Sequence, residues 1–187
     1  MMLPRNRSAA ALISPTVTRV GALIGIPSPQ RSPLDASGDP RSSCMVAGVS
    51  SLKIVPRYAE IDQQGVVFNG HYLTWFDEAC TALLDGHGLD YAQLTTTGVD
   101  FQVVHSEIDY LTSVRWRDDV RVDAVCDHIG TTSFAVSFTV LRTAPGDPRG
   151  VEQVAVRGRN VYVVVSTDGW AKRELPDALR QALEAAR

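Results

Sequence analysis

The sequence predicts an α+β domain in which a single antiparallel sheet covers one long apolar helix. Apolar residues recur at helical spacing over positions 72–84, and four segments with the alternating pattern of strands follow over positions 101–166. No helical pattern separates those four segments. Because an apolar helix must be buried against another element, the sheet formed by these strands is expected to wrap around it.

The length and composition fit one globular domain. The 187 residues are 44% hydrophobic and 21% charged, and no apolar run approaches the roughly 20 residues that span a bilayer. Cys44, Cys80 and Cys126 are widely spaced and form no CxxC pair, which argues against a disulfide framework and a zinc site. We therefore expect a protein without an integral membrane segment, located in a reducing compartment, the cytoplasm.

Residues 1–48 differ in character from the rest of the chain. Prolines interrupt regular structure throughout this stretch, which is also rich in Ser, Ala, Gly and Arg. We predict a disordered extension over residues 1–48 and a folded domain over residues 49–187. Three explanations of the extension stay open: an ordinary disordered segment, a targeting peptide, and a start codon assigned too early, with Met45 as the true initiator.

Charge is unevenly distributed along the chain. Residues 1–44 carry a net charge of +3 and the remaining residues one of −6, which gives the total of −3. The acidic balance of the predicted domain argues against nucleic-acid binding. An anionic ligand would need a local basic patch.

The predicted elements begin with a short strand over Leu52–Tyr58. A helix follows the next loop, where Asn69 is suited to the N-cap position and Gly86 and Gly88 are suited to ending the helix. Its predicted apolar face consists of Tyr72, Trp75, Phe76, Ala79, Cys80, Leu83 and Leu84.

A meander of long antiparallel strands is predicted after a turn-rich stretch at Thr95–Gly98. Gly130 with Thr131, and the run 144–148, supply turns between strands. A final short helix should begin at Pro176. The four strands are expected over Phe101–Val114, Asp119–Ile129, Thr132–Thr143 and Glu152–Ser166.

A carboxylate ahead of the long helix is the first candidate for a functional site. Asp62 precedes a loop that contains Gly65 and runs into the helix. The unpaired N–H groups and positive dipole end of a helix start can hold an oxyanion, while an Asp can act as base or nucleophile. The simpler alternative is that Asp62 only caps the loop.

The segment Tyr58-x-x-x-Asp62-x-x-Gly65-Val-Val-Phe-x-x-x-Tyr72 and the order of the elements resemble the hotdog-fold thioesterases of the 4-hydroxybenzoyl-CoA thioesterase type, which include acyl-CoA thioesterases associated with the Tol–Pal system. The resemblance covers about residues 50–180. It implies the hotdog fold, with the sheet wrapped around the helix, and hydrolysis of a CoA thioester to free acid and CoA. Supporting similarities lie at Asp109-Tyr110-Leu111, Arg117-Asp118-Asp119 and Ile129-Gly130-x-x-Ser133.

The same resemblance assigns roles to residues. It implies that Asp62 is the catalytic carboxylate, acting as nucleophile on the thioester carbonyl or as base for a water. It places at Asn69 the backbone N–H that polarises the thioester oxygen. Relatives of the Tol–Pal type carry a His at that position, so the resemblance implies no His assistant here. Some relatives place their acid on the helix, which makes Glu78 the reserve candidate.

The resemblance also implies a binding site for the phosphates and acyl group of CoA, with no metal or cofactor. Phosphates call for local basic groups, and Arg115 with Arg117 flank a strand end. A homodimer or homotetramer with sites at the subunit seam is expected, since a lone sheet leaves free edges. The predicted substrate-binding residues are Tyr58, Gly65, Phe68, Gly70, His71, Thr132, Ser133, Arg157 and Arg159.

Other functions stay open at this point. The fold also serves as a non-catalytic acyl-CoA binding or sensing module, against which Asp62 argues. A hotdog dehydratase pairs a His with an Asp or Asn a few residues on, and His71 followed by Phe76 does not fit that pattern. His105, Glu107 and Asp109 share one face of a strand, for which a polar strand face is a simpler interpretation than a metal site.

Overall fold

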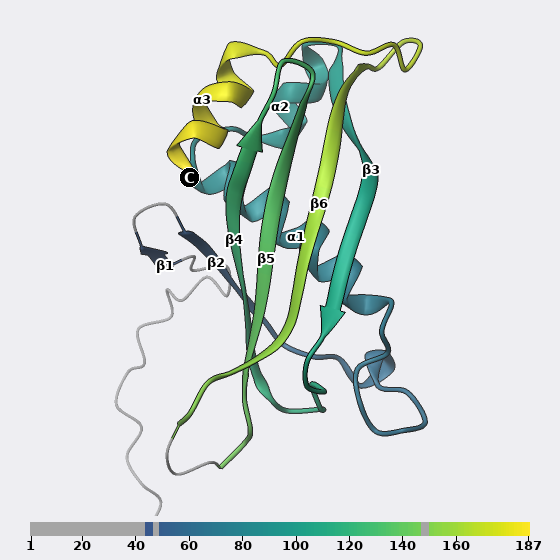
Figure 1. Ribbon diagram of the computed structural model, residues 1–187, viewed down its shortest axis with the longest axis vertical. Helices are drawn as coiled ribbons and strands as arrows, with labels where there is room; N and C mark the ends of the chain where they lie inside the picture. The colour runs from purple at the N-terminus through teal and green to yellow at the C-terminus, as the bar shows by residue number, and fades with distance from the viewer. Residues whose placement is uncertain (1–43, 47–48, 147–149) are drawn as a thin grey trace, which may run out of the picture. The chain divides into compact units, whose positions relative to one another are not determined.

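The computed structural model describes residues 44–46, 49–146 and 150–187 (Figure 1). They form one antiparallel sheet and three α-helices, which confirms the predicted α+β class. Most of the predicted N-terminal extension lies outside the described residues. Its residues Cys44–Val46 form strand β1, which pairs with the first strand of the domain.

The sheet has six strands in the order β1-β2-β4-β5-β6-β3, with all neighbours antiparallel. The predicted meander is correct for β4, β5 and β6 and wrong for β3, which lies beyond β6 with Tyr110 opposite Val156. Because β2 occupies the position beside β4, β3 joins the sheet at the other side of the meander and becomes an edge strand. The strands are β1 Cys44–Val46, β2 Val49–Ile54, β3 Val99–Tyr110, β4 Asp119–Ile129, β5 Ser133–Thr143 and β6 Gln153–Ser166.

Two predicted strands differ from the observed ones at their ends. β2 stops at Ile54, four residues before the predicted end, and Tyr58–Glu60 form a 3₁₀ turn, η1. Pro56 lies between them, and proline has no N–H to donate to a neighbouring strand. β3 begins at Val99 and ends at Tyr110, so residues 111–114, predicted as strand, belong to the connection to β4.

The long helix, α1, runs over His71–Gly86 and lies behind the sheet in the view of Figure 1. All seven residues of its predicted apolar face are buried, as expected. Phe76 stacks on Phe138 of β5, with ring centroids 4.6 Å apart. A Cβ built on Gly158 of β6 would lie 2.2 Å from the Phe76 ring. A glycine at this position therefore lets the helix approach the sheet.

The predicted end of α1 is correct, and its predicted N-cap is not. Gly86 is its last residue, and Gly88 beyond it has φ +81°, a conformation that favours glycine. The prediction that Asn69 caps the helix is wrong. Gly70 holds the N-cap position, and no side chain caps this end. The first turn thus starts one residue later than the sequence pattern suggested.

Two short helices complete the described domain. α2, Tyr91–Thr96, occupies part of the region predicted as turns, and the Asp90 side chain caps it by accepting from Ala92 N. The Asp at N-cap spacing was the signal for this helix. α3, Asp177–Ala185, follows Pro176 as predicted, and its buried face packs against β4 and α1. Within the described residues, no helix has the length and apolar character needed to cross a membrane.

Candidate active site

A groove of about 730 Å³ opens at the start of α1. One wall is the loop between η1 and α1, which carries Asp62. The other wall is the end of β3 and the connection that follows it. The groove is lined by Asp62, Gln63, Gln64, Val66, Val67, Phe68, Asn69, Tyr72, Tyr110, Leu111, Thr112 and Ser113.

The Asp62 loop is held in shape by its own backbone. Ile61 and Val67 form an antiparallel bridge across its base, and Val67 N also donates to Val114 O at 2.9 Å. At the tip, Gly65 N donates to Asp62 O at 2.9 Å, and Gly65 has φ +76°. A residue with a side chain is strained at such a φ, which explains a glycine at the tip.

The Asp62 carboxylate does cap this loop. Its Oδ1 accepts from Gln64 N at 2.8 Å and from Val66 N at 3.5 Å. No described group donates to Oδ2, and the half-buried side chain lines the groove. The capping interpretation and the catalytic one are therefore compatible, because one oxygen fixes the carboxylate and leaves the other for chemistry.

Asn69, two residues ahead of α1, lines the same groove. His71 N donates to Phe68 O at 3.0 Å, while no described backbone carbonyl accepts from Asn69 N–H. The Tyr110 hydroxyl donates to Asn69 O at 3.2 Å. This bond fixes the peptide that joins Asn69 to the helix. A carboxylate oxygen and an unpaired amide thus line one groove, an arrangement suited to attack on a carbonyl.

Glu60 anchors the loop from beneath, although the sequence did not single it out. Its side chain is only 3% exposed and accepts from Arg57 N at 2.8 Å, from the Arg57 guanidinium at 2.6 Å and from Trp75 Nε1 of α1 at 3.4 Å. Its carbonyl accepts from Phe68 N at 2.9 Å. Burial by itself raises the pKa of Glu60, but the hydrogen bonds and charge of Arg57 outweigh it, so the pKa is lowered.

The wall formed by the end of β3 was largely missed by the sequence analysis. Tyr110 and Leu111 enter the sequence pattern only as a similarity to known thioesterases, and residues 111–114 are predicted as strand. Tyr110 packs edge-on against Tyr72 of α1, with centroids 5.7 Å apart. Burial raises the pKa of the Tyr72 hydroxyl, which accepts from Val114 N at 3.4 Å. Only the pairing of β3 with β6 places this segment beside the helix start.

The predicted binding residues of the loop lie at or beside the groove, with one exception. Phe68 lines it, the His71 ring is edge-on to Phe68 at 6.0 Å, and a Cβ on Gly70 would lie 3.0 Å from the Phe68 ring. Tyr58 does not belong to the lining. It is 77% exposed and packs edge-on against Trp116.

The other predicted binding residues are not brought to the groove within one chain. Thr132 and Ser133 lie at the turn between β4 and β5. This turn is at the end of the sheet opposite the groove, and the whole of β4 separates the two (Figure 1). The 11 residues of β4 span about 35 Å. Arg157 and Arg159 lie on β6 and alternate with Gly158, which faces α1, so they occupy the outer face of the sheet.

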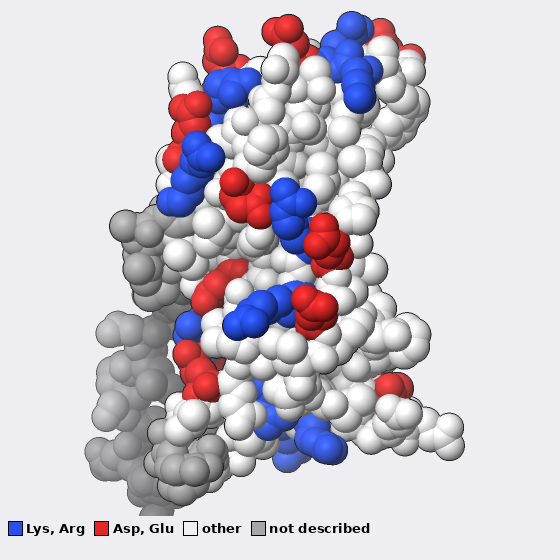
Figure 2. Space-filling view, viewed as in Figure 1, with Lys and Arg blue, Asp and Glu red and all other residues white. Residues whose placement is uncertain are grey.

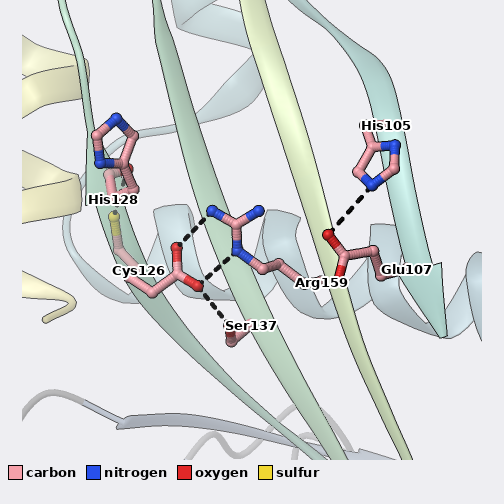
Figure 3. Close-up of polar contacts among 7 residues, drawn as sticks. His105, Glu107, Cys126, His128, Ser137 and Arg159 are labelled. Carbon is pink, nitrogen blue, oxygen red and sulfur yellow. Dashed lines mark hydrogen bonds and ion pairs between the residues drawn. The ribbon is translucent and has the colours of Figure 1, made fainter. Parts of the chain in front are cut away.

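The outer face carries charged side chains of both signs side by side, as Figure 2 shows. In Figure 3, Arg159 Nε donates to Asp127 Oδ2 at 2.8 Å and the Ser137 hydroxyl donates to the same carboxylate at 2.6 Å. His105 and Glu107 of β3 form another pair at 3.1 Å. Among the described residues, no cluster of His, Cys, Asp or Glu is suited to holding a metal ion.

Other reactive groups lie away from the groove. Glu78 is exposed on α1 and does not belong to the lining. Burial raises the pKa of the Cys80 thiol to about 12 and that of Cys126 to about 11, which leaves both thiols unreactive. A second hollow, of about 200 Å³, contains Lys53, Asp119, Arg121 and Glu152, whose charges already pair with one another. Asp62 is thus the carboxylate best placed for chemistry.

Known proteins are similar to this chain in sequence and in fold. Residues 64–147 match the family model of the thioesterase superfamily. YneP of Bacillus subtilis, provisionally named an acyl-CoA thioesterase, is 40% identical over 62 residues, which span 33% of this chain and 45% of that protein. The 1,4-dihydroxy-2-naphthoyl-CoA hydrolase of Prochlorococcus marinus is 27% identical over 143 residues, 72% of this chain and 87% of the hydrolase.

Solved structures confirm the fold. The 4-hydroxybenzoyl-CoA thioesterase of Pseudomonas sp. strain CBS-3 superimposes with a TM-score of 0.64 at 20% identity, over 73% of this chain and 98% of that one. At that identity the similarity concerns the architecture. It identifies the sheet wrapped around α1 as the hotdog fold.

Proposed function

We propose that this protein, whose residues 64–147 belong to the thioesterase superfamily, is an acyl-CoA thioesterase that works in the groove at the start of α1. The observation that carries the proposal is the pairing, in one groove, of the Asp62 carboxylate with the unpaired N–H of Asn69. The reaction converts a CoA thioester and water into a free acid and CoA.

Asp62 supplies the carboxylate for one of two routes. As nucleophile, its Oδ2 bonds to the thioester carbonyl carbon, the C–S bond breaks, CoA leaves as thiolate, and water then hydrolyses the acyl-aspartyl anhydride. As base, it takes a proton from a water whose oxygen bonds to the same carbon, and the thiolate leaves. Single turnover in H₂¹⁸O that places ¹⁸O in Asp62 identifies the nucleophilic route, with water attacking the Asp62 carbonyl of the anhydride. Attack on the acyl carbonyl places ¹⁸O in the free acid, as the base route also does.

The Asn69 amide stabilises the charge that develops on the carbonyl oxygen in either route. Its position at the start of α1 adds the favourable dipole of the helix end. The Asn69 side chain has no part in this step. Tyr110 donates to Asn69 O and so holds the next peptide, which joins Asn69 to Gly70.

The oligomeric state and the compartment are part of the proposal. The groove lies beside the free edge strand β3, so a second copy pairing there would extend its wall, and we propose a homodimer or a homotetramer built from such dimers. We assign the activity to the cytoplasm. The two free thiols of the described domain, Cys80 and Cys126, fit that reducing compartment.

The test is the release of CoA from a panel of short, medium, long and aromatic acyl-CoAs. Aromatic groups belong in the panel because Phe68, Tyr72 and Tyr110 line the groove. We expect Asp62→Asn to lower kcat by about 100-fold or more, as loss of a catalytic base or nucleophile does. The matched control is Asp85→Asn, the same change at an exposed site on α1, which should retain wild-type kcat.

Two results would contradict the proposal. Full activity of Asp62→Asn would remove Asp62 from the mechanism. Tight binding of acyl-CoA by the wild-type protein without any turnover would instead identify a binding or sensing module.

A further inference from the structure

A buried ion pair contacts the connection from β3 to β4 and has no role in the chemistry described so far. It joins Arg142 of β5 to Asp118, the residue before β4, with 3.4 Å between Nε and Oδ2. The Arg142 side chain is 14% exposed and the Asp118 side chain 1% exposed. Arg142 shares a face of β5 with Val140 and with Phe138, which stacks on α1. Two charges thus lie on the face of the sheet that covers the helix.

Both members of the pair hold the backbone of the connection. Arg142 Nη1 donates to Ser113 O, and Asp118 Oδ2 accepts from Arg115 N at 2.9 Å. Asp118 N also donates to Arg115 O at 3.1 Å, which closes the turn. Val114, between these points, is held by the bonds described above. The pair therefore fixes the connection at two places, one on each side of Val114.

The first of these places belongs to the groove. One wall of the groove consists of Tyr110, Leu111, Thr112 and Ser113, which we call the β3 wall. Leu111 N and Thr112 N donate to Ala155 O of β6 at 2.8 and 3.0 Å. Because β3 ends at Tyr110, such contacts rather than strand pairing set the position of the wall. The bond from Arg142 to Ser113 O holds its far end.

Stability of the fold does not by itself account for a buried pair of charges. The cost of taking two charges out of water can exceed their mutual attraction, and neutral residues of similar volume often stabilise a core equally well. Arg142 Nε is buried without an aligned hydrogen bond, so its contact with Asp118 is an ion pair only. The directional bond of the guanidinium is the one from Nη1 to Ser113 O, at the groove wall.

We propose that Arg142 and Asp118 are positioning residues that hold the β3 wall where it selects the acyl group. The reacting carbonyl lies at Asp62 and the Asn69 N–H, on the opposite wall, so a bulky acyl group contacts the β3 wall more than acetyl does. Neither member of the pair lines the groove. This proposal rests on the proposed function, because it concerns the choice among substrates of the same reaction.

The main test is Arg142→Lys. Lysine keeps a positive charge beside Asp118 and lacks the planar fork whose separate nitrogens contact Asp118 and Ser113 O. The kcat/KM is measured for the largest and the smallest acyl-CoA hydrolysed in the panel described above. We expect it to fall about tenfold or more for the largest acyl group, because the wall is displaced, and by less than about twofold for the smallest.

A second variant and a stability measurement separate positioning from folding. The double variant Asp118→Asn with Arg142→Met replaces the pair by neutral side chains, a change that protein cores often tolerate. It should shift the selectivity in the same direction as Arg142→Lys. The midpoint of urea unfolding is measured for each variant, because a purely structural pair would lower stability and would lower kcat/KM for all substrates alike.

The matched control is Arg121→Lys. Arg121 of β4 also forms ion pairs, with Asp123 and Glu152, and does not line the groove. The same substitution there should leave the ratio of the two kcat/KM values unchanged.

Binding without turnover is measured by calorimetric titration with S-phenacyl-CoA and S-acetonyl-CoA. These thioethers differ only in the group that takes the place of the acyl chain, which is aromatic in the first and small in the second. Arg142→Lys should weaken binding of the phenacyl compound about tenfold and leave binding of the acetonyl compound nearly unchanged.

The outcomes separate this proposal from the proposed function. Unchanged selectivity and unchanged thioether binding in Arg142→Lys would overturn the positioning role and leave the thioesterase activity intact. An equal loss for large and small acyl groups would also overturn it, in favour of a purely structural pair. Absence of turnover in the wild-type protein would overturn the activity, while the titrations would still decide whether the pair shapes the groove.

Discussion

Single residues decide how closely α1 approaches the sheet. Gly158 carries no side chain where Phe76, which is fully buried, meets β6. This contact sets how closely α1, which follows the Asp62 loop, packs on β6. The position of one glycine in β6 therefore affects the groove, although Gly158 does not line it.

We predict that Gly158→Ala destabilises the protein. The new Cβ would lie 2.2 Å from the Phe76 ring, and such overpacking of a core costs about 1–3 kcal/mol or more. Thermal or urea unfolding measures the change. The matched control is Gly169→Ala, where a Cβ would meet nothing within 4 Å and the free energy of unfolding should change by less than about 0.5 kcal/mol. Equal stability of the two variants would contradict this account.

At the residue scale, the sequence located the Asp62 loop ahead of α1 but not the contacts that shape it. Asp62 was selected from its motif, and the structure places it in a groove with Asn69 N–H. The sequence misassigned the Asn69 side chain to a cap and did not detect the burial of Glu60. The pattern of residue types along the chain does not show that Trp75, 15 residues later, packs against Glu60 and buries its carboxylate.

Elements are joined at the site by Glu60, which links η1 to α1. Its carboxylate receives donors from Arg57 on one side and from Trp75 on the other. The loop that carries Asp62 is thereby tied to α1. The buried Glu60 carboxylate, with donors from both sides, is the structural basis for a fixed distance between the Asp62 loop and α1.

We predict that Glu60→Gln lowers stability in a pH-dependent way. The pKa of Glu60 is lowered in the folded protein, so the carboxylate stabilises the fold above its unfolded pKa of about 4.3, and this contribution is lost as pH falls through the folded pKa. The variant should lose about 1–3 kcal/mol at pH 7. The difference from wild type should shrink below about pH 4.

Unfolding in urea at several pH values measures this effect. Glu184→Gln, on an exposed site of α3, provides the same chemical change without buried donors and should leave stability nearly unchanged at every pH. A loss for Glu60→Gln that did not depend on pH would point to a purely steric role of this side chain.

Element types were well predicted, and their order in the sheet was not. The bounds of β4 matched the prediction, and β5 and β6 began one residue later than expected. The alternation of apolar and polar residues shows which face of a strand is buried. That face is the same whichever strand pairs with it. The partner of β3 depends instead on β2, which is separated from β3 by 44 residues and takes the place beside β4.

At the scale of the whole molecule, β3 pairs only with β6 among the described residues, and its outer edge is free within that part of the chain. Val103 is 47% exposed and Val104 59% exposed at an irregularity in its pairing with β6. Leu111, which lines the groove, is 53% exposed just beyond the strand. Free edges with apolar side chains favour pairing with another chain.

We predict a homodimer or larger homo-oligomer that forms through β3. Light scattering at micromolar concentration should give at least twice the mass of one chain. Val104→Lys, which places a charge beside this edge, should shift the protein toward monomer and lower activity. Val55→Lys adds the same charge at an exposed valine away from β3 and should leave the mass unchanged. A wild-type monomer would contradict the proposed interface.

The sequence by itself determined the α+β class, the apolar face of α1, the three-strand meander and the place of Asp62 in a loop ahead of that helix, because each depends on residues close together in the chain. Only the tertiary structure decided the edge position of β3, the Tyr110 wall of the groove, the burial of Glu60 and the contact of Tyr58 with Trp116. These features join segments 15 to 67 residues apart. Long-range contacts arise when the whole sheet closes over the helix, and local patterns do not encode which distant segments then meet.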